Sequence, residues 1–362
     1  MSALGQDHRR TVARWVTLPA VPVALAVLVL GLWLAGSAGS SVLGDPGAMT
    51  RWGLPIARLV FDSCMAVTVG CLLFATAILP RSTAPRRGGP GDHGTDGGDP
   101  QPALIRVVNA ASVSAGIWTV SAAAMAVFSY SDAAAIPINV STDFTQGLGD
   151  YLANFDQGRA WAAATIIAAL TTTLAFALRS PAGLAWATVV AVIGIVPMAL
   201  IGHSAGGDDH WGAVNSIGLH LLGICAWVGG LVALGLVAGL LPGRTPALTK
   251  AGRDESGYMA ADVLSRFSTL AGCAILLVIG SGIASASIRV HDLDQLNTAY
   301  GWLLIAKFVL SLGLGVLGLV HRRWIIPKLR AGQVTARAAA WRVISVEVAV
   351  MGAVMGLAGA LA

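Results

Sequence analysis

The stretch 58–80, RLVFDSCMAVTVGCLLFATAILP, decides the fold, because its only two charged residues, Arg58 and Asp62, stand at its start. An α-helix needs about 20 consecutive apolar residues to cross the hydrocarbon core of a bilayer. The chain contains eight more stretches of this kind, so we predict an all-α polytopic membrane bundle of nine helices. The predicted spans are 16–38, 56–79, 104–130, 159–178, 183–202, 215–240, 267–287, 302–320 and 341–361.

The composition supports this assignment. Of the 362 residues, 56% are hydrophobic and 11% are charged, and the mean hydropathy is +0.74. Soluble domains usually carry about 25% charged residues, so a soluble enzyme, a disordered chain and a coiled coil are excluded. The apolar runs are long and lack alternation with period two, which excludes a transmembrane barrel.

The basic residues predict the orientation of the bundle. With the N-terminus placed in the cytoplasm, 18 of the 23 Lys and Arg residues fall in inner segments, as the positive-inside rule requires. The C-terminus is then outside, and the net charge of +5 records orientation and not nucleic-acid binding. A cleaved signal peptide in place of the first helix would leave eight spans with the same orientation.

The chain divides around one polar segment. Residues 81–103 are rich in Gly, Pro and Asp, and we expect a disordered cytoplasmic linker there. Residues 1–80 would hold the first two helices. Residues 104–362 would form a seven-helix domain, joined by 56–80 into a single membrane domain.

Ionisable residues inside spans are costly, so each is a functional candidate. Asp62, His220 and Lys307 all fall in the outer third of the predicted membrane. Each also has a simpler interpretation: Arg58 stands four residues before Asp62 and predicts a local ion pair, and Lys307 can extend toward the outer surface. Asp62 and Lys307 are alternatively candidates for a gate between helices. Glu347 lies nearer the inner side, within reach of inner arginines.

The segment 201–211, IGHSAGGDDHW, predicts a metal site at the outer face. It places His203, Asp208 and His210 in one short loop, and His220 follows on the next helix. Imidazole is the commonest transition-metal ligand, and carboxylates suit a divalent ion. Polar loops also contain His and Asp by chance, so both interpretations stay open. Trp227 lies on the same face as His220, and Gly229-Gly230 permits close helix packing.

Sulfur ligands are scarce. Cys64 and Cys71 share one helix face, and Met351 and Met355 are four residues apart on the last span. Thioethers at this spacing suit Cu(I), although buried packing is the simpler interpretation. The chain has no Walker A, DKTGT-like or GxSxG motif, so we do not expect an enzyme, while redox activity stays open.

Several stretches together resemble the CopD family of bacterial copper-resistance membrane proteins. They are 58–80, IGHSAGG (201–207), HLLGICAWVGGLVAL (220–234), SGIASASIRV (281–290) and TAYGWLLIAKFVLSLGLGVLG (298–318). The resemblance implies copper handling at the plasma membrane, with His203 and His220 at the family's histidine positions and Asp62 and Lys307 at its polar span positions. The composition is similar to that of actinobacterial members, which are often fused to a CtaG-like oxidase-assembly domain.

We therefore expect a copper transporter or permease that works inward from the outer face. The expected metal ligands are His203, His220, His210 and Asp208, and the expected path runs past Asp62 toward Cys64, Cys71, Met351 or Met355. A periplasmic copper chaperone or a CtaG-like domain is the expected partner. Two alternatives stay open: a b-type haem or quinone-reactive redox protein with His203 and His220 as axial ligands, and an oxidase-assembly protein that transports nothing.

Overall fold

Every regular element that the structure describes is a helix, which confirms the all-α membrane bundle. The computed structural model describes residues 23–27, 29–30, 44–80, 102–201, 210–237, 250–289, 297–325, 327–328 and 346–357. Within these ranges, seven helices are long and apolar enough to cross a membrane: Gly47–Ile78, Pro102–Ala134, Asp156–Ala177, Pro181–Leu200, Val214–Val237, Asp262–Ser285 and Leu304–Trp324.

These seven helices agree with seven of the nine predicted spans. The predicted spans 16–38 and 341–361 fall partly outside the described residues, so the total of nine and the orientation stay predictions. A shorter apolar helix, Val346–Leu357, lies within the last predicted span, and it is called the last helix below.

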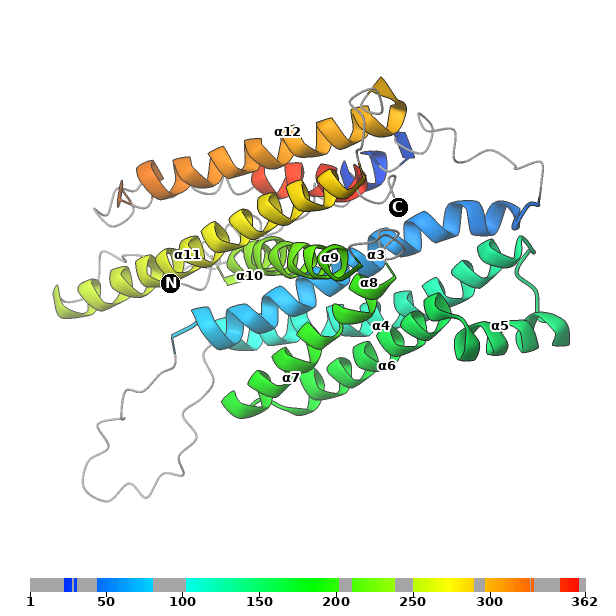
Figure 1. Cartoon of the computed structure of the whole chain (residues 1–362). Helices are drawn as coiled ribbons and strands as arrows, with labels where there is room; N and C mark the ends of the chain where they lie inside the picture. The colour runs from blue at the N-terminus through cyan, green and yellow to red at the C-terminus, as the bar shows by residue number, and fades with distance from the viewer. Residues whose placement is uncertain are drawn as a thin grey trace, which may run out of the picture.

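Figure 1 shows α3 (Gly47–Leu73) between two groups of helices. On one side lie α4 (Pro102–Ala134), α6 (Asp156–Ala177) and α7 (Pro181–Ile193). On the other side lie α9 (His210–Ile224), α10 (Gly230–Val237), α11 (Lys250–Arg289) and α12 (Ala299–Val320). The remaining helical elements are η1 (Phe74–Ile78), α8 (Val196–Leu200), η3 (Cys225–Gly229) and η5 (His321–Ile325).

The central contact between the two groups depends on glycine. A Cβ atom on Gly229 of η3 would lie 1.9 Å from the carbonyl oxygen of Ala66 on α3, and one on Gly70 would lie 2.4 Å from the Gly229 backbone. Only residues without a side chain allow two backbones to approach so closely. The close approach predicted for Gly229-Gly230 is therefore confirmed.

The connection between α6 and α7 is a tight turn at Ser180-Pro181. The hydroxyl of Ser180 accepts a hydrogen bond from the backbone N–H of Gly183 at 3.1 Å, and Pro181 opens the helix. These are the residues that favour the start of a helix. The turn holds α6 and α7 antiparallel as neighbours.

One helix was not predicted. α5 (Thr142–Asn154) lies between two spans, and its side chains Phe144 and Tyr151 are buried. Both rings pack on Tyr130 of α4, with centroid distances of 5.1 and 5.7 Å. Burial, with a smaller contribution from the charge of Asp132, raises the pKa of Tyr151 to about 12.

The predicted linker 81–103 is shorter at its C-terminal end, because α4 begins at Pro102. Residues 81–101 lie outside the described residues.

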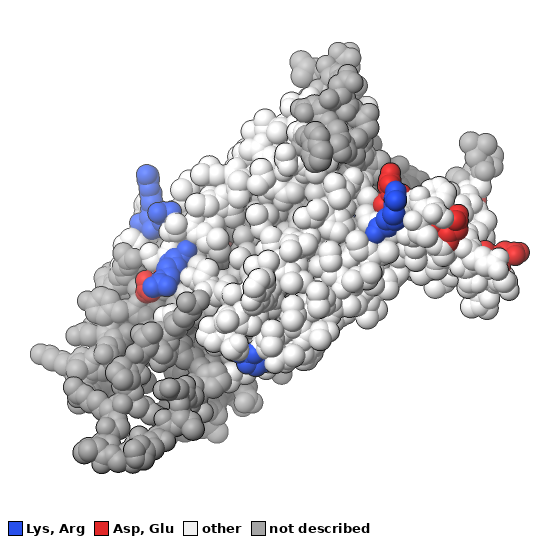
Figure 2. Space-filling view, turned by 60° about the horizontal axis from the view of Figure 1, so that its bottom comes forward, with Lys and Arg blue, Asp and Glu red and all other residues white. Residues whose placement is uncertain are grey.

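The surface matches a membrane protein. Figure 2 shows charged side chains gathered toward the two ends of this face, with an uncharged surface between them. Large apolar side chains such as Val120, Ile166, Trp186 and Leu276 are exposed on the spans. Because a bilayer is an apolar solvent, these side chains need no protein partner.

Candidate functional site

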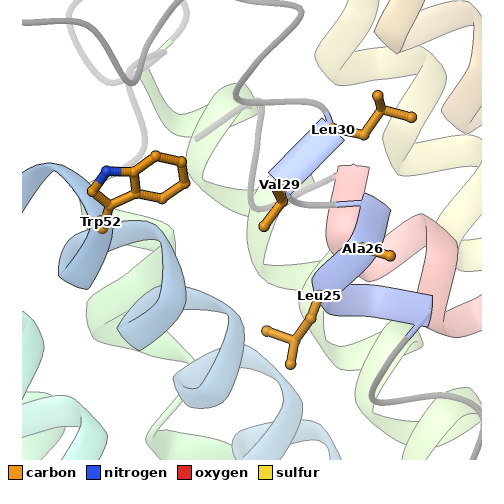
Figure 3. Close-up of a pocket in the computed structure, with 5 residues that line it drawn as sticks. All are labelled: Leu25, Ala26, Val29, Leu30 and Trp52. Atoms are coloured by element: carbon orange, nitrogen blue, oxygen red, sulfur yellow. The ribbon is translucent and has the colours of Figure 1, made fainter.

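Of two hollows in the described part of the structure, one is lined by side chains that can bind a metal. The larger is an open groove lined by Leu25, Ala26, Val29, Leu30 and Trp52. Figure 3 shows Trp52 on α3, across from the segment that carries the other four, with Ala26 and Leu30 pointing away from it. None of its aliphatic walls offers a metal ligand. This groove is therefore a surface for lipid or protein side chains and not an ion site.

The smaller hollow is a partly open pocket of about 40 Å³, which we call the His220 cavity. Four parts of the bundle line it: α9 with η3, α11, α12 and the last helix. Its lining residues are His220, Ile224, Trp227, Val228, Val278, Lys307, Ser311, Leu314, Met351, Val354 and Met355. A volume of this size holds one or a few water-sized species.

The cavity unites four of the residues singled out in the sequence. His220, Lys307, Met351 and Met355 lie on three helices and are separated by up to 135 residues, yet all four line the same space. Trp227 lines it as well, so its predicted place on the face of His220 is confirmed. The structure thus combines an imidazole, two thioethers and an ammonium group in one small volume.

The hydrogen bonds of His220 fix its tautomer. Nδ1 lies 3.2 Å from the carbonyl oxygen of Val278 and 3.1 Å from Oγ of Ser281. A carbonyl only accepts, so Nδ1 carries the proton and donates it. Oγ of Ser281 donates to the carbonyl of Leu277 at 2.5 Å, which leaves its lone pairs to accept from Nδ1. The neutral ring therefore keeps the lone pair of Nε2 for a ligand.

This arrangement is typical of metal-binding histidines. A ligating imidazole generally donates its second N–H to a backbone carbonyl or carboxylate, which fixes the ring and its tautomer. Here α11 supplies that partner. The ring also packs closely on α11, because a Cβ atom on Gly282 would lie 3.7 Å from its Cε1.

A serine cluster fixes α9 against α11 one turn from His220. The hydroxyl of Ser216 donates to the carbonyl of Ser281 at 2.8 Å and lies 2.8 Å from Oγ of Ser285. Ser216 and Ser281 are both buried. The sequence did not predict these hydrogen bonds, because they join residues that are 65 and 69 positions apart.

The two methionines lie one turn apart on the last helix, as their spacing predicts. Met351 is buried, and Met355 also packs against Ala24 and Leu59. Glu347 is buried one turn before Met351 and shares its face of the helix. The cavity itself has no carboxylate among its lining residues.

A π-helical segment, η3, directly follows α9, the helix that carries His220. η3 places Trp227 and Val228 at the cavity wall while its Gly229 contacts α3. π-helical turns within longer helices occur frequently at functional sites. This one joins the cavity to the central helix of the bundle.

Asp62 lies elsewhere in the bundle. Its carboxylate pairs with Nε of Arg58 at 3.2 Å, the local ion pair that their spacing predicts. The Arg58 guanidinium lies 5.7 Å from the ring centroid of Trp161. Asp62 is not among the residues that line the His220 cavity.

The cysteines also lie apart from the cavity. Cys64, Cys71, Cys225 and Cys273 are all free thiols, and none lines the cavity. Cys71 is fully buried in the core, and the Cys64 carbonyl accepts a hydrogen bond from Ser114. Cys71 and Cys225 occupy the place of small core residues, Cys64 is half-buried, and Cys273 is exposed.

The outer loop of the predicted site is only partly described. His203 and Asp208 lie outside the described residues, and His210 forms the first residue of α9, with its side chain also outside the description. Among the residues that are described, no three His, Cys, Asp or Glu side chains gather into a metal site. The metal site of three histidines and an aspartate expected from the sequence (His203, His210, His220 and Asp208) therefore stays a prediction.

Two family models match the chain. Residues 49–213 match the model described as copper resistance protein D-like, N-terminal domain, and residues 261–361 match copper resistance protein D. The chain belongs to the CopD family of copper resistance membrane proteins. The second match contains the cavity residues of α11, α12 and the last helix.

Two curated proteins are similar to part of this CopD-family chain. The copper transport protein CutJ of Bacillus subtilis is 30% identical over 128 residues, which cover 35% of this chain and 22% of CutJ. The inner membrane protein YebZ of Escherichia coli is 29% identical over 123 residues, which cover 34% of this chain and 38% of YebZ. The matches thus span about a fifth and two fifths of these relatives, and no solved structure matches.

The family and the helices together establish the broad class. The chain is a copper-related, multi-pass protein of the bacterial inner membrane.

Proposed function

We propose that this protein passes copper, as Cu(I), from the outer face of the inner membrane toward the cytoplasm, with the His220 cavity as a binding station on the path. One observation carries the proposal: the side chains of His220, Met351 and Met355 line the same small cavity. Thioether and imidazole ligands favour Cu(I) over hard cations.

The ligands in the cavity favour a site that an ion passes through over a site that stores the ion. A conducting site must bind well enough to admit an ion and weakly enough to release it. Neutral ligands without a thiolate or carboxylate meet this requirement, because they leave the charge of the ion uncompensated. A storage or structural site would be expected to use charged ligands at closed coordination.

The size of the cavity favours a single ion over a porphyrin. Pockets for organic ligands and cofactors usually measure about 300–1,000 Å³, whereas the His220 cavity measures about 40 Å³. No observation on the described residues favours the haem alternative.

The outer loop fits the proposal as the mouth of the path. His203, Asp208 and His210 directly precede or begin α9, the helix that presents His220. We place copper capture there, and delivery from a periplasmic chaperone or to a CtaG-like oxidase-assembly domain belongs to the same proposal. Asp62, Cys64 and Cys71 would then serve a later stage of the path, on the α3 side of the bundle.

Transport into proteoliposomes tests the proposal. Vesicles would contain a chromophoric Cu(I) chelator, and anaerobic Cu(I) would be added outside. The wild type should import copper, and the double variant Met351→Leu, Met355→Leu should import it at least about tenfold more slowly, because Leu conserves the volume and removes the ligand. Met198→Leu, which changes a buried methionine outside the cavity, is the matched control. Equal rates in wild type and the double variant would overturn the proposal.

A further inference from the structure

The helix α12 is the least buried of the seven spans that the structure describes. Only 6% of its most apolar window is buried inside the protein, compared with 61% for Gly47–Ile78. Figure 1 shows α12 at the edge of the bundle. The position of this helix therefore depends on the surrounding lipid as well as on contacts with other helices.

The contact between α12 and α11 has Arg322 at one end. Ile275 of α11 lies against Gly315 and Gly318 of α12, because Cβ atoms on these glycines would lie 3.9 and 3.7 Å from its side chain. One turn further along, a Cβ atom on Gly272 of α11 would lie 3.7 Å from Nη1 of Arg322. The guanidinium group of Arg322 therefore lies over a glycine of the neighbouring helix, while its side chain stays exposed.

Two arginines and a tryptophan follow one another at this end of the span. Arg322, Arg323 and Trp324 belong to η5, and all three are exposed. Trp324 is also the last residue of the apolar span that begins at Leu304. Tryptophan is enriched at the level where the hydrocarbon meets the headgroups. The two guanidinium groups are therefore placed at the headgroup level of the membrane.

The two guanidinium groups have no acidic partner in the described part of the chain. Of the ion pairs among the described residues, none includes Arg322 or Arg323. On the neighbouring helix α11, by contrast, Arg266 pairs with Asp262 at 2.9 Å. A guanidinium group offers parallel N–H donors whose geometry matches a phosphate. The end of α12 thus presents two phosphate-binding groups side by side in the sequence.

The face of α12 below Arg323 is apolar and exposed. Leu319 and Val316 stand four and seven residues before Arg323, on the same side of the helix, and each is 60% exposed. Leu312 continues this face and is also exposed. A free anion would use only the charges, whereas a phospholipid uses both the charges and the apolar face.

We infer that this end of α12 binds an anionic phospholipid. The headgroup phosphate lies on Arg322 and Arg323, and an acyl chain lies along Val316 and Leu319. Because Arg322 rests on Gly272, the bound lipid joins α12 to α11 where the two helices have few side chains in contact. The inference goes beyond the proposed function and holds whether or not the His220 cavity binds a metal.

Native mass spectrometry of the purified full chain in detergent, titrated with phosphatidylglycerol, tests the inference. Phosphatidylcholine, which carries the same acyl chains and no net charge, is the reference lipid. In Arg322→Gln, Arg323→Gln the Kd for phosphatidylglycerol should rise by about tenfold or more, since each arginine near an anionic headgroup strengthens binding by about fivefold. The Kd for phosphatidylcholine should stay the same.

The matched control is Arg179→Gln, Arg266→Gln, which removes the same charge from the turn between α6 and α7 and from α11. It should keep the wild-type Kd for phosphatidylglycerol. An unchanged Kd in the variant of Arg322 and Arg323, or an equal rise in the control, would overturn the inference.

Competition on the wild type tests the same site without a substitution. Glycerol phosphate and polyglutamate should leave phosphatidylglycerol bound, because neither has an acyl chain to place along α12. Displacement by glycerol phosphate would assign the arginines to a soluble anion, and displacement by polyglutamate would assign them to an acidic protein. Either result would overturn a lipid site.

Discussion

The imidazole Nδ1 of His220 lies 3.2 Å from the carbonyl oxygen of Val278, which stands 58 residues later in the chain. This bond links α9 to α11 and determines which ring nitrogen is available to an ion. Its partner is a backbone atom, so most substitutions at 278 would preserve it. The side chain that also lies within hydrogen-bonding distance of Nδ1 is Ser281, whose Oγ is 3.1 Å away.

Ser281→Ala should weaken Ag(I) binding by about tenfold, because partners of a metal-ligating imidazole contribute this much to affinity. The Val278 carbonyl remains, so binding should be reduced and not lost. The measurement is competition with a Cu(I)/Ag(I) chelator of known affinity. Gly282→Ala is the control, since its new methyl would meet the His220 ring at an ordinary 3.7 Å. If both variants bind like the wild type, the tautomer argument fails.

Gly229→Ala should destabilise the bundle by about 1–3 kcal/mol or prevent its assembly, because overpacking forces backbone shifts. The added Cβ would lie 1.9 Å from the carbonyl oxygen of Ala66. Thermal unfolding in detergent measures the effect. Gly280→Ala, at a position where a Cβ meets nothing within 4 Å, should unfold near the wild-type temperature. Equal stability of the two variants would show that α3 and η3 do not touch in this way.

Asp45 makes the start of α3 dependent on pH. Its carboxylate accepts hydrogen bonds from Arg51 and, at 2.9 Å, from the backbone N–H of Gly47. The hydrogen bond from Arg51, followed by that from Gly47, lowers the pKa of Asp45 below its usual 3.8. A depressed pKa contributes stability above the unfolded value and loses it as pH falls through the folded value.

Protection of the first-turn amides of α3 from hydrogen exchange should therefore be greater in the wild type than in Asp45→Asn at pH 5–7. The difference should begin to shrink as pH falls below the usual pKa of 3.8 and disappear once pH is below the lowered pKa of the folded state. Asp143→Asn, in the first turn of α5, is the control for loss of a carboxylate at another helix start. A difference that persists unchanged at pH 2.5 would contradict the assignment.

The orientation gives another test. In a chain whose four cysteines are alanine, Asn139→Cys should react with a membrane-impermeant maleimide in intact spheroplasts, because the positive-inside rule places that loop outside. Ala182→Cys, in the turn between α6 and α7, should react only after lysis. Both positions are exposed, so access depends on sidedness alone. Labelling in the reverse pattern would invert the direction of the proposed path.

The spans were predictable because a bilayer requires about 20 apolar residues whatever the neighbouring helices are. The Arg58–Asp62 pair and the methionines at 351 and 355 were predictable because both depend on spacing within one helix. α5 was not predicted because it is short and polar. Ser141, which is its N-cap, and Phe144 and Tyr151, which are buried, are the residues that could have indicated it.

The sequence could not predict which helices come together to form the His220 cavity. Spans that are apolar on all sides do not reveal which face meets protein and which meets lipid. Residues 220, 307 and 351 meet only once helices far apart in the chain have packed together. The sequence did identify these residues, because the membrane tolerates so few polar and ionisable side chains.

X-ray absorption spectroscopy at the copper edge, on the full chain loaded anaerobically with Cu(I) in nanodiscs, tests the central claim most directly. The His220 cavity predicts a first shell with one nitrogen and two sulfur ligands. In Met351→Leu, Met355→Leu the sulfur contribution should be lost, and in Met198→Leu it should be unchanged. A sulfur shell that survives in the double variant, or a wild-type shell without sulfur, would contradict the assignment of copper to this cavity.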